Sequence, residues 1–162
     1  MRRLLQTAFA VSAVAVALVA NADRAAADDF TEYRRAMKDF GPVINDWLGE
    51  VDAYSAAAKS KPEILQDAAL SDLAARGHSI AGDLVGTVAP GTYADSHATL
   101  TAAIEALASA ADDAPAADGS AFASAIADDM SAARTALRDI YSYAVRRGKG
   151  TIDLPVPPVM GN

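Results

Sequence analysis

The sequence predicts an all-α protein, an antiparallel up-down-up-down four-helix bundle that follows an N-terminal export signal. The chain after residue 27 is rich in alanine, a strong helix former, and poor in runs of β-branched residues. Its apolar residues recur at alternating steps of three and four, the spacing of one face of a helix. Four segments have this pattern, and short links join them. Neighbouring helices can therefore bury their apolar faces together only by running antiparallel.

Residues 1–27 have the composition of a secretory signal peptide. Two arginines precede an uncharged apolar run over residues 4–20, and two A-x-A cleavage patterns end at Ala22 and Ala27. Cleavage after Ala27 leaves a c-region of ordinary length, so we expect the mature chain to start at Asp28. The alternative is an uncleaved membrane anchor, but the run is short for a bilayer span and rich in weakly hydrophobic alanine. The predicted location is periplasmic or secreted.

Charge and cysteine content exclude several classes of function. The chain contains no cysteine, which excludes a lipoprotein anchor, disulfides, thiol catalysis, thiolate metal sites and covalent c-type haem. Removal of residues 1–27 takes away three of the 14 basic and one of the 21 acidic side chains, which leaves a net charge of −9. This acidic surface repels nucleic acid phosphates and anionic lipids and favours solubility outside the cell. We expect no nucleic-acid partner.

The first predicted helix starts at Asp28, where two aspartates suit an N-cap and the first turn, and it continues to about Ala58. Its apolar stripe keeps its phase through Gly41 and Pro42, so the sequence predicts one long helix bent there rather than two helices. The stripe consists of Phe30, Tyr33, Met37, Phe40, Ile44, Trp47, Val51, Tyr54 and Ala58.

The segment SKPE, from Ser60 to Glu63, matches the capping box and predicts the start of a second helix that ends near Gly86. Gly77 and Gly82 each cost this helix roughly 1 kcal/mol relative to alanine. Its predicted inward face carries Leu65, Ala69, Leu73, Gly77, Ile80, Leu84 and Val88.

The segment TYAD, from Thr92 to Asp95, predicts the cap of a third helix after a turn at residues 89–91. Residues 112–120 form a predicted linker, and a fourth helix then ends at Gly148, a residue that favours the left-handed cap. The third stripe consists of Tyr93, His97, Leu100, Ile104, Leu107 and Ala111. The fourth consists of Phe122, Ile126, Met130, Ala133, Leu137, Ile140 or Tyr141, and Ala144. The bundle thus spans residues 28–148, and residues 149–162 form a proline-rich tail that is extended or loosely docked.

His97 and His78 are the two histidines of the chain. We expect His97 to be a buried, hydrogen-bonded residue that orients the helices, with Asp83 as a candidate partner across the turn. The alternative is a metal or haem site. The two histidines are offset by about 6 Å along the bundle axis at helical rise and could share a metal if both leaned inward.

Catalytic motifs are missing from the sequence. Neither histidine has an acidic residue three positions before it, as a di-iron bundle requires, and the linker lacks the carboxylates of a calcium loop. There is no HExxH, no GxSxG and no glycine-rich phosphate loop. We therefore predict that the protein is not an enzyme and has no cofactor-binding residues. Trp47 is expected to be a core residue, with a partner-binding face as the alternative.

The segment APGTYADSHATLTAA resembles a stretch of uncharacterised bacterial exported helical proteins, in which a proline-containing turn leads into a helix reading H-x-x-L-x-x-A. The matching residues are Pro90, His97, Leu100 and Ala103. The resemblance covers roughly the second half of the chain, implies a helical bundle and brings no activity with it. The predicted function is a non-enzymatic binding domain with a protein or cell-envelope partner. The alternative is a haem or metal carrier, and membrane contact is expected only if the signal is not cleaved.

Overall fold

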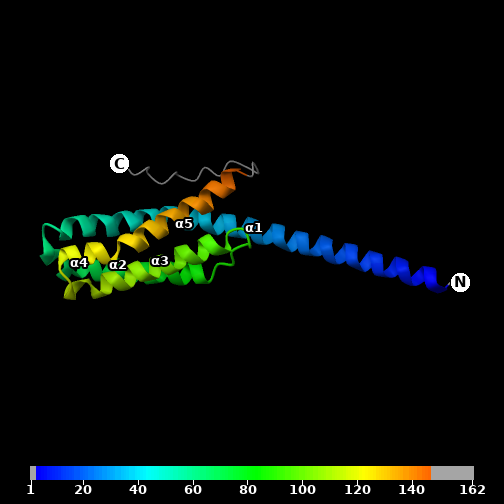
Figure 1. The fold of residues 1–162 in the computed structure, drawn as a ribbon, viewed down its shortest axis with the longest axis horizontal. Coiled ribbons are helices and arrows are strands. Elements are labelled where there is room, and N and C mark those ends of the chain that lie inside the picture. Colours follow the sequence, from blue (N-terminus) through cyan, green and yellow to red (C-terminus); the bar gives the residue numbers. More distant parts are fainter. Residues whose placement is uncertain (1–2, 147–162) are drawn as a thin grey trace.

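The computed structural model describes the backbone of residues 3–146 and the side chains of residues 30–142 except residue 116. This part of the chain is helical and contains no strand, as the sequence predicts. The side chains of the predicted signal peptide and the whole predicted tail lie outside the described residues. The elements in chain order (Figure 1) are α1 (Arg3–Ala58), η1 (Pro62–Gln66), α2 (Ala68–Val85), α3 (Ala94–Asp113), η2 (Ala114–Ala116), α4 (Gly119–Ala125) and α5 (Ala127–Arg146), where η denotes a 3-10 helix.

Helix α1 is continuous through Pro42, as the phase of its apolar stripe predicts. Gly41 is needed at this place because a Cβ atom there would collide with the ring of Tyr141. The Tyr141 hydroxyl donates a hydrogen bond of 3.2 Å to the carbonyl of Met37, one turn before the proline. The same helix passes through Asp28 without a break, so Asp28 does not cap a helix in this structure.

The N-terminal half of α1 projects beyond the other helices, which lie along its C-terminal half (Figure 1). Among the described residues, no helix is both long enough and apolar enough to cross a membrane.

The start of the second helix differs from the prediction. The Ser60 hydroxyl donates to the carbonyl of Ala57 and therefore extends the end of α1 instead of capping a new helix. Pro62 begins η1, and α2 starts only at Ala68 after an extended Asp67. Leu65, Leu73, Gly77 and Leu84 of the predicted inward face are buried, and Leu70, Ala74 and Ala81 are buried with them. The predicted Ala69 and Val88 are exposed.

The cap predicted at Thr92 is also absent. The N-cap of α3 is Tyr93, which makes no side-chain capping bond, because the chain enters the helix through turns closed by the carbonyls of Pro90 and Gly91. The predicted stripe of this helix is nevertheless buried along its whole length.

The predicted fourth helix is divided into α4 and α5 at Ile126. The backbone bonds from Ile126 to the Phe122 carbonyl and from Met130 to the Ile126 carbonyl persist across the division. The apolar stripe therefore keeps its phase, and its members from Phe122 to Tyr141 are buried.

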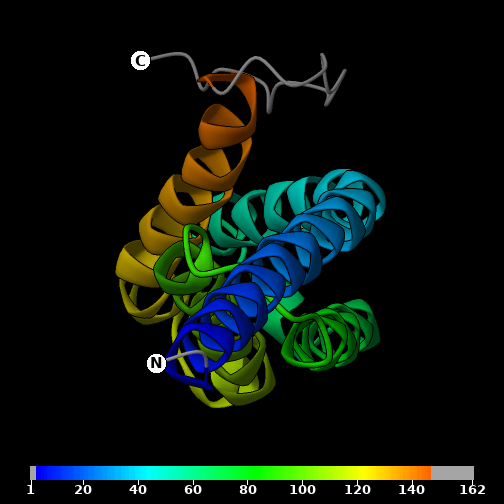
Figure 2. The same ribbon diagram turned by 90° about the vertical axis from the view of Figure 1, so that its right-hand side faces the viewer.

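The helices approach one another at two different spacings. Helix α3 lies close to both α2 and α5, because many facing residues are alanine or glycine. Helix α1 lies farther from its neighbours, and its large side chains fill the space between them. Viewed along the molecule, α5 is inclined to α2 and α3 (Figure 2). The largest fully buried side chains are Trp47, Tyr33, Phe122, Ile44, Leu48, Leu65, Leu70, Leu73, Leu84, Leu100, Ile104 and Leu107.

Candidate functional site

His97 lies in the first turns of α3 and is 8% exposed. Its Nε2 is 3.0 Å from the carbonyl oxygen of Leu84, which can only accept, so this nitrogen carries the proton. Its Nδ1 is then an acceptor and lies 3.2 Å from the hydroxyl of Tyr33 in α1. Both ring nitrogens are thus used in bonds that connect α3 to α2 and α1.

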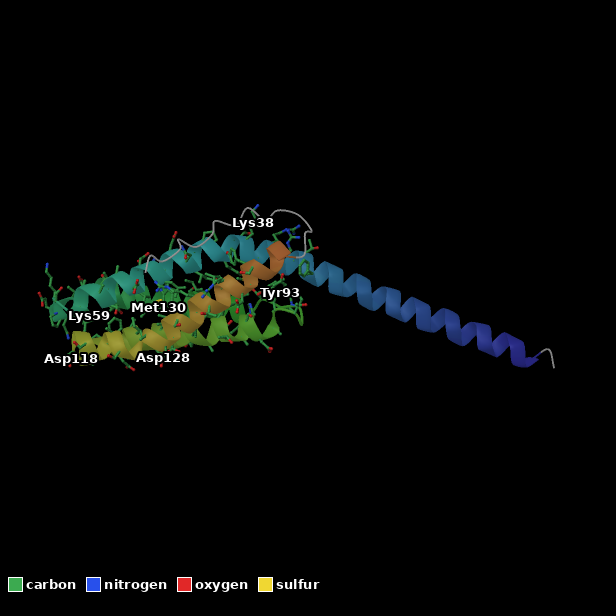
Figure 3. The ribbon with its side chains drawn as sticks, turned by 45° about the horizontal axis from the view of Figure 1, so that its top comes forward. Lys38, Lys59, Tyr93, Asp118, Asp128 and Met130 are labelled. Atoms are coloured by element: carbon green, nitrogen blue, oxygen red, sulfur yellow. The ribbon has the colours of Figure 1, made fainter. Side chains whose placement is uncertain are left out.

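The surroundings of His97 favour this arrangement. Burial raises the pKa of Tyr33 well above its ordinary value, with the neighbouring Tyr93 as a second cause, so the hydroxyl stays protonated and can donate. The rings of Tyr33 and Tyr93 are 5.2 Å apart, and Phe30 stacks on Tyr93 at 5.8 Å. Figure 3 shows Tyr93 at the end of the molecule where α1 projects. His97 is part of an aromatic cluster that fixes this end of the fold.

Asp83 is not the partner of His97. Its side chain is exposed on α2, and the Tyr33 hydroxyl and the Leu84 carbonyl are bound to the two ring nitrogens. Leu84 is the buried residue at the end of α2, so its backbone, and not the side chain of its exposed neighbour, faces α3.

His78 lies on the outer side of α2 and is not brought together with His97. Its Nδ1 is 3.0 Å from a carboxylate oxygen of Glu105, and its Nε2 is 3.0 Å from one of Asp112, both in α3. These two bonds raise the pKa of His78, because both carboxylates favour the protonated ring.

The described residues contain no group of three or more histidine and acidic side chains that could hold a metal ion. The histidines occupy separate places, and each uses both ring nitrogens within the protein. A metal or haem at His97 would have to displace either Tyr33 or Leu84.

Trp47 is a core residue in this structure, 1% exposed. Its indole ring packs on Gly77 of α2, where a Cβ atom would collide with it, and its Nε1 donates a 2.8 Å bond to the Leu73 carbonyl. The sequence predicted the burial but not this bond, which joins the C-terminal half of α1 to the first half of α2.

Two open grooves flank the C-terminal half of α1. The α1–α2 groove contains Tyr54 and a bidentate ion pair between Glu50 and Arg76. The hydrogen bonds from Arg76 hold the pKa of Glu50 below its ordinary value. Asp72 also lines this groove, so its charged side chains are two acidic groups and one basic group, and Arg76 is paired with Glu50.

The α1–α5 groove has a different character. It is lined by Asp52, Ser55 and Lys59 from α1 and by Ser131, Arg134 and Arg138 from α5, over a floor that includes Met130. Its side chains provide three positive charges and one negative charge, on a chain whose net charge is −7.

Sequence reasoning missed the α1–α5 groove. Arg134 and Arg138 are one turn apart on α5, and Ser55 follows Tyr54 on the buried side of α1. The position of Ser55 beside an apolar stripe is the one sign in the sequence of a hydroxyl group near a buried helix face. The meeting of these residues, however, depends on how α5 crosses α1, which the sequence pattern does not specify.

Comparisons of the chain with protein-family models, with curated proteins and with solved structures found no match.

Proposed function

We propose that this protein is an exported, non-enzymatic binding domain that recognises its partner outside the cytoplasmic membrane through the surface around α1. In this proposal residues 1–27 are a signal peptide, and residues 28–148 act as an antiparallel four-helix bundle. The segment that would be removed corresponds to the part of α1 that projects beyond the other helices in Figure 1.

The observation that carries the proposal is the composition of the interior. Apart from the tyrosine hydroxyls and the Trp47 indole, the polar residues among the buried ones with a described side chain are Ser55 and His97, and His97 is held by hydrogen bonds at both ring nitrogens. Catalysis requires reactive groups that converge on a sheltered pocket. Here polar side chains line open grooves on both sides of α1, an arrangement that favours recognition at the surface.

Export is tested by the N-terminus of the protein from the cell envelope and the culture medium. Intact mass and N-terminal sequencing should show a chain that begins at Asp28, or at Asp23 if the earlier site is used. Ala27→Arg, which spoils the favoured site, should move cleavage or block it. An unprocessed chain confined to the cytoplasm would contradict the proposal.

Recognition is tested by photocrosslinking in the producing cell. A photoreactive amino acid replaces Tyr54 in the α1–α2 groove or Ser131 in the α1–α5 groove, and the control is Ser109, which is exposed on α3 and lines neither groove. We expect one discrete adduct at a groove position and none at the control. Adducts of equal yield at all three positions would count against a specific surface.

A further inference from the structure

The α1–α5 groove is electropositive on an acidic molecule. Lys59 lies near the end of the bundle that also holds Asp118, and Met130 lies between α1 and α5 (Figure 3). Toward the other end of the groove, Arg134 pairs with Asp52, and Arg138 follows one turn later. Cationic groups of α1 and α5 thus face one hollow, where they attract anions against the charge of the whole chain.

Arg134 is only partly satisfied. Its side chain is 24% exposed, and its one hydrogen bond within the described residues goes to Asp52, at 3.2 Å. A guanidinium has five N–H donors in a fork that suits a two-oxygen partner. Arg76 in the α1–α2 groove shows the contrast, since it holds both carboxylate oxygens of Glu50. Arg134 therefore keeps donors for a second oxyanion.

Ser55 supplies an independent observation. It is 7% exposed, it lines the α1–α5 groove, and its hydroxyl has no hydrogen-bond partner in the part of the chain that the structure describes. The Ser55 oxygen is reachable from the groove, so its hydroxyl can pair there with a ligand or with water. The neighbouring groove side chains include a second hydroxyl, that of Ser131.

We propose that the α1–α5 groove binds a small organic anion by a carboxylate or phosphate group. Arg134 and Arg138 hold the anionic group, Ser55 donates its hydroxyl to it, and Asp52 competes with it for Arg134. Lys59 lies one helical turn from Ser55 on α1, about 6 Å along the axis, so a ligand with a second negative charge should bind more tightly. The anion site goes beyond the proposed recognition of a partner and can hold or fail independently of it.

The test is a titration of the purified exported protein with citrate, succinate and inorganic phosphate at constant ionic strength, followed by NMR of the backbone amides. Citrate should give saturable shifts that concentrate at Ser55, Ser131 and Arg134, and it should bind more tightly than succinate. The phosphate arm distinguishes the source of the oxyanion, because preferential binding of phosphate would assign the site to phosphorylated compounds. Dimethyl succinate, which carries no charge, should give no saturable shift.

Variants distinguish a specific binding site from non-specific attraction between charges. Arg134→Gln should weaken citrate binding about tenfold or more, the value expected for a charge-assisted hydrogen bond, and Ser55→Ala about threefold to tenfold. Arg76→Gln removes the same charge from the α1–α2 groove and should change the affinity by less than about twofold. Asp52→Asn should tighten binding, because it removes the internal competitor.

The inference is overturned if none of the three anions gives saturable shifts up to about 20 mM, or if Arg76→Gln weakens binding as much as Arg134→Gln. Circular dichroism of each variant establishes that it is folded, and Asp52→Asn supplies a gain of affinity that unfolding cannot imitate. Failure of the titration leaves the crosslinking result untouched. Failure of crosslinking or export removes the proposed function while the anion site can still be measured.

Discussion

At the scale of single residues, the fold depends on large aromatic side chains that pack against glycines, which have no side chain. Trp47 fills the space between α1 and α2 only because Gly77 has no Cβ atom, and Tyr141 reaches α1 only because of Gly41. The burial of Trp47 and His97 follows from their positions on apolar stripes and could be predicted. Their partners, the Leu73 carbonyl and the Tyr33 hydroxyl, could not, because they depend on how helices far apart in sequence are aligned.

Replacing Trp47 should be among the most damaging single changes. Trp47→Ala removes a fully buried ring and leaves the space above Gly77 empty, so the free energy of unfolding should fall by about 3–5 kcal/mol. Trp47→Phe, which keeps an aromatic ring but loses the bond to Leu73, should cost less. Urea titrations followed by circular dichroism measure both, since the variants lack the single tryptophan of the chain. A loss below about 1 kcal/mol for alanine would mean that this face is not core.

Gly77 and Gly82 form a matched pair within α2. A Cβ atom on Gly77 would collide with the Trp47 ring and lie 2.8 Å from the Cβ of Ala108, whereas one on Gly82 meets nothing within 4 Å. Gly77→Ala should therefore lower the free energy of unfolding by about 1–3 kcal/mol. Gly82→Ala should raise it by up to about 1 kcal/mol, because alanine is the better helix former. If both variants were stabilised equally, the close contact between α1 and α2 would be disproved.

At the scale of helices and turns, the apolar patterns were informative and the caps were not. The stripes of α1 and α3 and the members of the fourth stripe from Phe122 to Tyr141 lie where the sequence predicts, since burial of a continuous face fixes the phase of a helix. The predicted caps at Ser60 and Thr92 do not form, because each residue lies beside a proline-containing turn that fixes the local backbone. Capping motifs describe a preference of a few residues, which a neighbouring turn can override.

The cap that does form is Asp118, whose carboxylate accepts a 2.7 Å bond from the backbone amide of Ala121 at the start of α4. Asp118→Ala should lower the free energy of unfolding by about 1 kcal/mol, because the first turn of α4 then loses its acceptor. The matched control is Ser60→Ala, which should change it by less than about 0.5 kcal/mol since Ser60 caps no helix. Thermal and urea unfolding measure both variants. A larger effect at Ser60 than at Asp118 would restore the capping box that the sequence suggested.

At the scale of the whole molecule, polar chemistry is concentrated on the surface and the interior carries almost none. The helix content and the apolar interior follow from composition and periodicity, and both could be predicted. The α1–α5 groove could not, because its cationic and hydroxyl side chains come from helices that are distant in sequence and meet only after packing. The pairing of His78 with Glu105 and Asp112, called here the His78 clamp, also depends on packing, in this case between the consecutive helices α2 and α3.

This clamp predicts how stability depends on pH. The pKa of His78 is raised in the folded protein, so the folded state binds the proton more tightly than the unfolded state does. The stabilisation is fully present below the ordinary histidine value of 6.5 and is lost as the pH rises through the higher folded value. His78→Gln should therefore lose more stability at pH 6 than at pH 9. The pairs are exposed and screened, so the difference should be at most about 1 kcal/mol and should shrink in high salt.

Urea titrations of the wild type and of His78→Gln at both pH values measure this difference. Glu105→Gln serves as a control that lowers the same contribution from the carboxylate side. A variant whose loss is equal at both pH values, or greater at pH 9, would show that His78 is not held as a cation between the two helices.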